Sequence, residues 1–194
     1  MSVRIATEQD LPQILAIYAP YVEQTTVSFE YEVPSSDAFR KRFLHITTRF
    51  PWLVWEENGE ILGYAYACAP FERAAYQWCA EPSIYLRQDA RGRGIGRKLY
   101  TALEAILQQQ GFRLSYAIIT SENDASLAFH ARMGYSHLAH FPDCAWKHGR
   151  LLGITWMQKQ LNSAEMTMNP PVPFSYFVKN SKNLQNILAK MSLS

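Results

Sequence analysis

Cysteine is scarce in this chain, whose 194 residues include three: Cys68, Cys79 and Cys144. An odd number without C-x-x-C spacing favours neither a disulfide framework nor a thiolate zinc site. The five histidines also lack H-E-x-x-H or other metal-ligand spacing, so we expect no metal ion. We interpret the cysteines as small apolar residues of the core, which is typical of a protein kept in the reducing cytoplasm.

Long apolar runs and an excess of one charge are absent as well. No apolar segment approaches the roughly 18 residues of a membrane span, and the N-terminus turns polar by Thr7. The 19 basic and 17 acidic side chains give a formal net charge of +2. This balance argues against the basic face of a nucleic-acid-binding protein, so we expect neither a membrane nor a nucleic-acid partner, and any anion site must be local.

The hydrophobic pattern of the chain, which is 48% hydrophobic, predicts a globular fold and its element order. Asn58-Gly59 predicts a tight hairpin, and Pro82 predicts a bulge or an unpaired strand edge. Hairpins mixed with helical crossovers predict an α/β (α+β) fold with a mixed, partly antiparallel central sheet flanked by helices. Strands are predicted at 3–6, 52–55, 61–68, 76–86, 114–120, 135–141 and 152–161; helices are predicted after caps at Thr7, at Ser35 or Ser36 and at Asn123 or Asp124, and over Ile95–Gln110.

The last 33 residues differ in composition, with clustered proline, asparagine and serine. We therefore expect one domain over 1–161 and a C-terminal extension over 162–194. The preferred interpretation of the extension is a mobile tail or a vector-derived segment. The alternative is that its apolar side chains dock it on the domain; these are Phe174, Tyr176, Phe177, Leu184, Ile187 and Leu188.

A glycine-rich turn lies between a predicted strand and the predicted helix Ile95–Gln110. Such a turn can aim unpaired backbone amides and a helix dipole at a phosphate, although an isolated match can also be a flexible surface turn. The turn lacks the Lys-Ser/Thr of a nucleotide P-loop and the spacing of G-x-G-x-x-G, so nucleotide hydrolysis and hydride transfer are disfavoured. The candidate anion-binding residues are Arg91, Gly92, Arg93, Gly94, Ile95, Gly96 and Arg97, with Lys98 beside them.

This turn resembles the acetyl-CoA motif of the GNAT superfamily of N-acetyltransferases, Arg/Gln-x-x-Gly-x-Gly/Ala, through Arg91, Gly94 and Gly96. The segment from Asn123 to Gly134-Tyr135 resembles the family's second segment, where a helix beside CoA ends in Gly-Phe or Gly-Tyr. The resemblance implies acetyl-CoA as cosubstrate and a splayed strand pair that admits the pantetheine arm.

Further motifs resemble the phosphinothricin and methionine sulfoximine acetyltransferase branch, and the resemblance spans about residues 3 to 161. Members of this branch commonly form homodimers, so a homodimer is expected. The chain departs from the branch at Leu151-Leu152-Gly153, where Trp-x-Asp is typical, and at Pro82. The matching motifs are Phe50-Pro-Trp-Leu-Val-Trp, Glu60-Ile-Leu-Gly-Tyr-Ala-Tyr-Ala, Glu81-Pro-Ser-Ile-Tyr-Leu and Lys147-His-Gly-Arg.

The resemblance also implies roles near the cosubstrate. The backbone of Ile84, Tyr85 and Leu86 would meet the pantetheine arm, unless these are core residues only. Asn123 would contact CoA, or cap a helix, or do both. His130 takes the place where many GNAT enzymes have a tyrosine that protonates the CoA sulfur; its alternative is a structural histidine.

On the acceptor side, Glu81 is a candidate to take the proton of the amine through water, if burial raises its pKa. The alternative for Glu81 is a surface charge at a strand edge. Ala69, Pro70, Phe71 and Ser83 match pocket-lining positions of the branch, and Arg73 is a candidate partner for an acceptor carboxylate.

The sequence thus predicts an N-acetyltransferase that moves an acetyl group to a small, amino-acid-like amine, of phosphinothricin or methionine sulfoximine type, by direct attack. Two alternatives stay open: a protein or peptide N-acetyltransferase, and a non-catalytic acyl-CoA-binding module.

Overall fold

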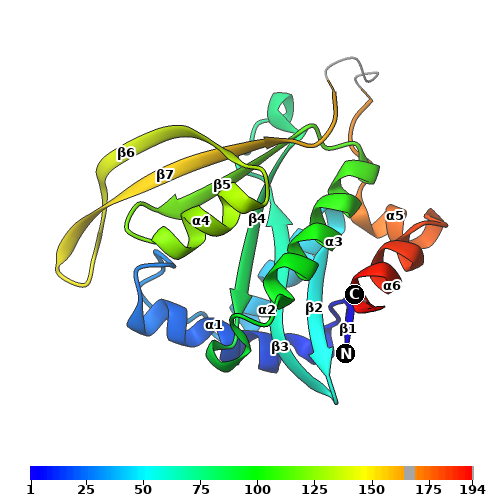
Figure 1. Cartoon of the computed structure of the whole chain (residues 1–194), viewed down its shortest axis with the longest axis horizontal. Coiled ribbons are helices and arrows are strands. Elements are labelled where there is room, and N and C mark those ends of the chain that lie inside the picture. The colour runs from blue at the N-terminus through cyan, green and yellow to red at the C-terminus, as the bar shows by residue number, and fades with distance from the viewer. Residues whose placement is uncertain (164–168, 194) are drawn as a thin grey trace.

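A computed structural model describes residues 1–163 and 169–193, and it confirms the predicted element order (Figure 1). The strands are β1 (Ser2–Ile5), β2 (Trp52–Glu57), β3 (Glu60–Cys68), β4 (Cys79–Leu86), β5 (Leu114–Thr120), β6 (Ser136–Lys147) and β7 (Arg150–Gln160). The α-helices are α1 (Leu11–Gln24), α2 (Ser36–Arg49), α3 (Ile95–Gln110), α4 (Asp124–Arg132), α5 (Phe174–Asn180) and α6 (Leu184–Leu193). Three short 3₁₀ turns are η1 (Glu8–Asp10), η2 (Ala74–Tyr76) and η3 (Gln88–Ala90).

The seven strands form one mixed sheet in the order β1-β2-β3-β4-β5-β7-β6. Within it β4 and β5 are parallel and the other neighbours are antiparallel. The parallel pair is joined at Cys79↔Leu114 and Ala80↔Ser115 alone, after which the two strands diverge (Figure 1). This divergence is called the splay below, and it confirms the predicted fold class.

Two hairpins are set by positive backbone φ angles. Asn58 (φ 51°) and Gly59 (φ 84°) form the predicted turn between β2 and β3. His148 (φ 51°) and Gly149 (φ 75°) form a second turn, between β6 and β7. The prediction that β6 ends at Phe141 was wrong. A bulge between Phe141 and Ala145 lets this edge strand continue past Pro142 to Lys147.

The predicted start of β4 at Tyr76 was also wrong. Residues 74–76 form the turn η2, closed by bonds from the Tyr76 and Gln77 amides to the carbonyls of Arg73 and Ala74. The carbonyl of Trp78 then accepts the amides of Arg113 and Leu114, so the strand begins at Cys79.

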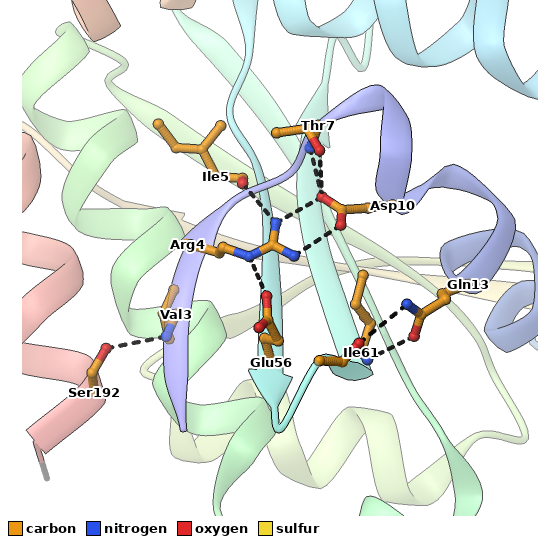
Figure 2. Close-up of polar contacts among 10 residues, drawn as sticks. Val3, Arg4, Ile5, Thr7, Asp10, Gln13, Glu56, Ile61 and Ser192 are labelled. Atoms are coloured by element: carbon orange, nitrogen blue, oxygen red, sulfur yellow. Dashed lines mark hydrogen bonds and ion pairs between the residues drawn. The ribbon is translucent and has the colours of Figure 1, made fainter.

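The first turn of the chain is fixed by an ion-pair network rather than by a simple helix cap (Figure 2). Thr7 precedes η1, and its amide and hydroxyl donate to the Asp10 carboxylate at 2.7 and 3.0 Å. Arg4 of β1 donates to both Asp10 oxygens and to Glu56 of β2. Burial alone would raise the pKa of Asp10, but the Arg4 and Thr7 hydrogen bonds lower it overall.

Helices cover both faces of the first four strands. On one face α3 packs its Leu99, Leu103, Ile106 and Leu107 into the main core. On the other face α1 and α2 surround Trp52 and Tyr64 of the sheet. The Ser35 hydroxyl accepts the amide of Ala38 and so caps α2. Of the two predicted caps, Ser35 and Ser36, the structure therefore uses Ser35. No helix among the described residues is long and apolar enough to cross a membrane.

The C-terminal extension packs on the domain, which favours docking over the mobile tail that the sequence suggested. Phe174, Phe177, Leu184 and Leu188 are buried in the same core cluster as α3, whereas Tyr176 is exposed. The amide of Val3 in β1 donates to Ser192 Oγ (Figure 2). Residues 164–168 and 194 lie outside the described part of the extension.

Candidate active site

The glycine-rich turn leads from η3 directly into α3. Gly92 (φ +76°) and Gly94 (φ +78°) are left-handed, and a Cβ at either would meet nothing within 4 Å. Backbone conformation, and not space, therefore requires glycine at these two positions. Gly94 is the N-cap of α3 and has no side chain to bond its first amides, so they remain available to a ligand.

Gly96 has a different role, which is close packing. A Cβ there would lie 3.4 Å from the Ile84 and Leu86 side chains and 3.7 Å from Phe129. The first turn of α3 can approach β4 this closely because the residue is glycine. The helix N-terminus is thereby held beside the splay.

The cations around the turn are not equivalent. Arg91 donates to Tyr21 Oη at 3.0 Å, with its guanidinium 5.4 Å from the centre of the Tyr21 ring. Arg93 forms a two-oxygen ion pair with Glu57. The ammonium of Lys98 lies 5.1 Å from the Trp55 ring centre, while Arg97 is exposed. Sequence reasoning found these cations but not Tyr21, since nothing in the helical period of α1 signals a contact 70 residues away.

The splay holds a cavity of about 60 Å³. It lies between β4 and β5, with α4 and Val27 also in its lining. The predicted residues Ser83, Ile84 and Tyr85 line it, as do Asn123 and His130. Leu86 does not line it. Its amide donates to Tyr21 Oη at 3.2 Å, and its carbonyl accepts from the same hydroxyl at 2.6 Å.

Strand register explains which backbone groups of β4 face this cavity. The Arg87 amide bonds to the Leu62 carbonyl, so in the antiparallel β3–β4 ladder residues 85, 83 and 81 also bond toward β3. The backbone groups of Ile84 and the carbonyl of Pro82 therefore face the splay. Pro82 continues the register with β3 without a bulge, so it follows the predicted alternative of an unpaired edge.

Glu81 stands at the first position where β4 and β5 part. Its side chain is half-buried, and burial raises its pKa to about 7. A carboxylate with this pKa is poised to accept a proton near neutral pH. Its ladder partner Cys68 is a weak acid, since burial first and the Glu81 charge second raise the pKa of the thiol to about 12.

His130 is 4% exposed, and both ring nitrogens have partners. Nδ1 lies 2.8 Å from the Ser126 carbonyl, and Nε2 lies 2.8 Å from Tyr100 Oη. A carbonyl can only accept, so Nδ1 carries the hydrogen and Nε2 accepts from the Tyr100 hydroxyl. Burial lowers the pKa of His130, which favours this neutral form and the structural interpretation of the residue.

Asn123 is confirmed as a helix cap, and its contact with CoA stays a prediction. Its Oδ1 accepts the amide of Ser126 at 3.1 Å and so caps α4. The same residue lines the splay cavity.

The predicted acceptor residues lie on two segments that border Glu81. Ala69, Pro70 and Phe71 follow β3, whose last residue, Cys68, pairs with Glu81. The Phe71 ring contacts Tyr76, Tyr116 and Trp156 at centroid distances of 4.8, 6.2 and 5.7 Å.

Ser83 and Arg73 complete the predicted set. Ser83 pairs with Tyr66 across the β3–β4 ladder. Arg73 is exposed at the start of η2. The sequence missed Tyr116 and Trp156, because strand periodicity does not show which aromatic rings meet across β5 and β7.

Comparisons with known proteins agree with this geometry. Residues 3–156 match the model of the acetyltransferase (GNAT) domain family. The chain is 37% identical over 169 residues to a phosphinothricin N-acetyltransferase of Alcaligenes faecalis, covering 86% of each chain. It is 39% identical over 166 residues to an L-methionine sulfoximine/L-methionine sulfone acetyltransferase of Pseudomonas aeruginosa, covering 83% of this chain and 95% of the relative.

A solved structure is also similar. The crystal structure of a GNAT superfamily phosphinothricin acetyltransferase from Sinorhizobium meliloti, in complex with acetyl-CoA, superposes with a TM-score of 0.82 at 35% identity. The match covers 87% of this chain and 92% of that one.

Proposed function

This chain belongs to the GNAT family of N-acetyltransferases, and we propose that it transfers the acetyl group of acetyl-CoA to the amine of a small, amino-acid-like acceptor. The acceptors that we propose are of the phosphinothricin or methionine sulfoximine type, which the names of the two relatives suggest. The observation that carries the proposal is the place of Glu81, a carboxylate with a pKa of about 7 at the position where β4 and β5 begin to part.

The residues of this chain fit acetyl-CoA as a cosubstrate. Amides at the N-terminus of α3 and the exposed cation Arg97 suit a pyrophosphate. The backbone of Ile84 and the carbonyl of Pro82 face the splay, where they can pair with an extended amide-containing chain. When bound, acetyl-CoA supplies a thioester carbonyl and a thiolate leaving group.

From the acceptor ammonium to the amide, nitrogen loses two protons and the CoA thiolate gains one. Glu81 accepts the first proton and passes it to solvent, and the neutral amine then forms the C–N bond as the C–S bond breaks. The second proton, lost from nitrogen after the C–N bond forms, balances the proton that the thiolate gains. Nε2 of His130 accepts a hydrogen bond from the Tyr100 hydroxyl. We therefore propose that Tyr100 and His130 position α4 beside the thioester and do not themselves supply the proton that the thiolate gains.

We also propose that 1–161 is the catalytic domain and that 162–194 stabilises it through its packing on α3 and β1. A homodimer is supported by the β6–β7 hairpin, called the arm below. The arm carries an edge strand and four exposed apolar side chains, Leu138, Phe141, Trp146 and Leu151. Sedimentation equilibrium at tens of micromolar protein tests this, and a monomer mass would reject it.

The proposed reaction is tested by following thiol release from acetyl-CoA with a panel of amines. We expect turnover with phosphinothricin or methionine sulfoximine, and a fall in kcat of roughly 100-fold in Glu81→Gln. Glu8→Gln, at an exposed glutamate of η1, is the matched control and should retain full activity. Turnover of peptides alone would support the peptide acetyltransferase instead, and acetyl-CoA binding without turnover of any amine would support a binding module.

A further inference from the structure

The tip of the arm contacts the segment that joins α1 to α2, although the two lie more than 110 residues apart (Figure 1). Lys147 Nζ donates to the carbonyls of Val22 and Ser28 at 2.7 and 2.6 Å. The hydroxyl of Tyr31 donates to the Trp146 carbonyl at 2.7 Å. The segment 22–31 is therefore fastened to the tip at both of its ends.

Lys147 is an unusual residue to bury. It is 2% exposed, and its two hydrogen-bond acceptors are neutral carbonyls. Burying an ammonium without a paired charge is costly, and here burial lowers the pKa of Lys147. Two features compensate for this: the Glu30 charge opposes the lowering of the pKa, and the Val22 carbonyl belongs to the last turn of α1, where the helix dipole is negative. Helix α1 has no basic residue of its own in that turn, so Lys147 supplies the missing cation from β6.

Between these two ends the segment runs across the splay. The carbonyl of Thr26 accepts from Thr120 Oγ1 of β5 at 2.5 Å. Ser28 is 5% exposed and bonds through its hydroxyl to Tyr18 of α1 at 2.7 Å. Val27 lies between them and lines the splay cavity, whose lining also includes α4 residues. The position of Val27 over the cavity thus depends on where Lys147 and Thr120 hold its neighbours.

We infer that Lys147 is a positioning residue that holds segment 22–31 closed over the splay and thereby shapes the cavity where the proposed pantetheine arm lies beside Ser83. The inference rests on the proposed function for its effect on catalysis, but not for the closure itself. Lysine suits this position because its compact ammonium can donate to two carbonyls from different elements.

The experiment replaces Lys147 with methionine, which keeps the length and apolar character of the side chain. Amide hydrogen exchange in 22–31 should rise about 10-fold or more, since the carbonyls of Val22 and Ser28 each lose a hydrogen bond to a charged group. With an acceptor in hand, KM for acetyl-CoA and KM for the acceptor should each rise about 10-fold, because Val27 lines the cavity in which the proposed pantetheine arm lies beside Ser83, while kcat should stay within about 2-fold. A merely structural lysine would change stability without raising either KM.

Lys159→Met is the matched control, because Lys159 also donates to a carbonyl, that of Met133, at the other end of the arm. It should leave exchange in 22–31 unchanged. If Lys147→Met fails to fold, Tyr31→Phe removes one exposed hydrogen bond of the same junction and should raise exchange in the same segment by a smaller factor. Unchanged exchange in the folded variant would overturn the inference. Because exchange is measured without substrate, failure of the acetyl-transfer proposal would not affect this result.

Discussion

The two parts of the sheet are built differently. Strands β1 to β4 are covered on both faces, by α1 and α2 on one side and by α3 with the C-terminal helices on the other. Strands β5 and β7 contribute to a small cluster with Tyr100, Tyr135 and side chains of α4, and most of β6 is exposed. Two residue pairs join the parts across β4 and β5. Stability is therefore concentrated in the first part. The proposed chemistry uses the seam, which is the β4–β5 boundary that opens into the splay.

The largest expected effect comes from removing residues 162–194. Four large apolar side chains of this extension are buried, and at about 1.5–3 kcal/mol each their loss amounts to roughly 6–12 kcal/mol. Since whole domains are stable by about 5–15 kcal/mol, we expect the truncated chain to be largely unfolded at 25 °C by circular dichroism. Two point variants keep the full chain length and test the packing alone. Phe177→Ala should lower the melting temperature more than Tyr176→Ala, because Phe177 is 7% and Tyr176 is 61% exposed. A truncated chain with an unchanged melting temperature would show that the first part is stable without the extension.

The seam should respond to strain at the glycine turn. Gly94→Val forces a β-branched residue to a positive φ, which costs about 1–3 kcal/mol or reshapes the turn, so acetyl-CoA affinity should fall about 10-fold or more by calorimetry. Gly59→Val imposes the same strain in the β2–β3 hairpin, where a Cβ also meets nothing within 4 Å. It should lower stability and leave affinity unchanged. Equal affinities in the two variants would remove the turn from the proposed site.

A variant of Tyr100 tests whether its hydrogen bond to His130 only holds α4 in place or also transfers a proton. In Tyr100→Phe the buried Nε2 loses its donor, and we expect a loss of about 1–3 kcal/mol in unfolding free energy. We expect kcat to fall less than about 10-fold, because neither group supplies the proton in this account. Urea unfolding and steady-state kinetics on the same variant give both numbers. A larger loss of kcat with unchanged stability would restore His130 and Tyr100 as a proton pathway.

The smallest effect is expected at the Arg4–Asp10 pair, well away from the seam. The pKa of Asp10 is lowered in the folded protein, so its stabilisation is complete above the unfolded value of about 3.9 and is lost as pH falls through the lower, folded pKa. Arg4 is a third exposed, so we expect Asp10→Asn to cost only about 1 kcal/mol at pH 7. The stability difference between wild type and variant should shrink below about pH 4, and a difference that grows there would contradict this assignment.

The sequence predicted the element order because the hydrophobic period, the Asn58-Gly59 turn and the helix caps are local signals. It also predicted the turn at Gly94 and the candidate base Glu81 from motifs. It missed Tyr21 at Leu86 and Lys147 at Val22, because these contacts join residues 65 and 125 positions apart and leave no periodic signal. The packing of the C-terminal extension was not predicted for a related reason. Its proline-rich start suggests a mobile tail, whereas the burial of Phe174 depends on contacts in the same core cluster as α3, which are distant in sequence.

The central claim is that Glu81 acts as the base at the seam, and the pH dependence of kcat/KM with one identified acceptor tests it most directly. In wild type, kcat/KM should rise through an inflection near pH 7 as Glu81 loses its proton. In Glu81→Gln that inflection should disappear, the rate should be roughly 100-fold lower near neutrality, and only the rise that belongs to the acceptor amine should remain. An unchanged inflection and rate in Glu81→Gln would contradict the account.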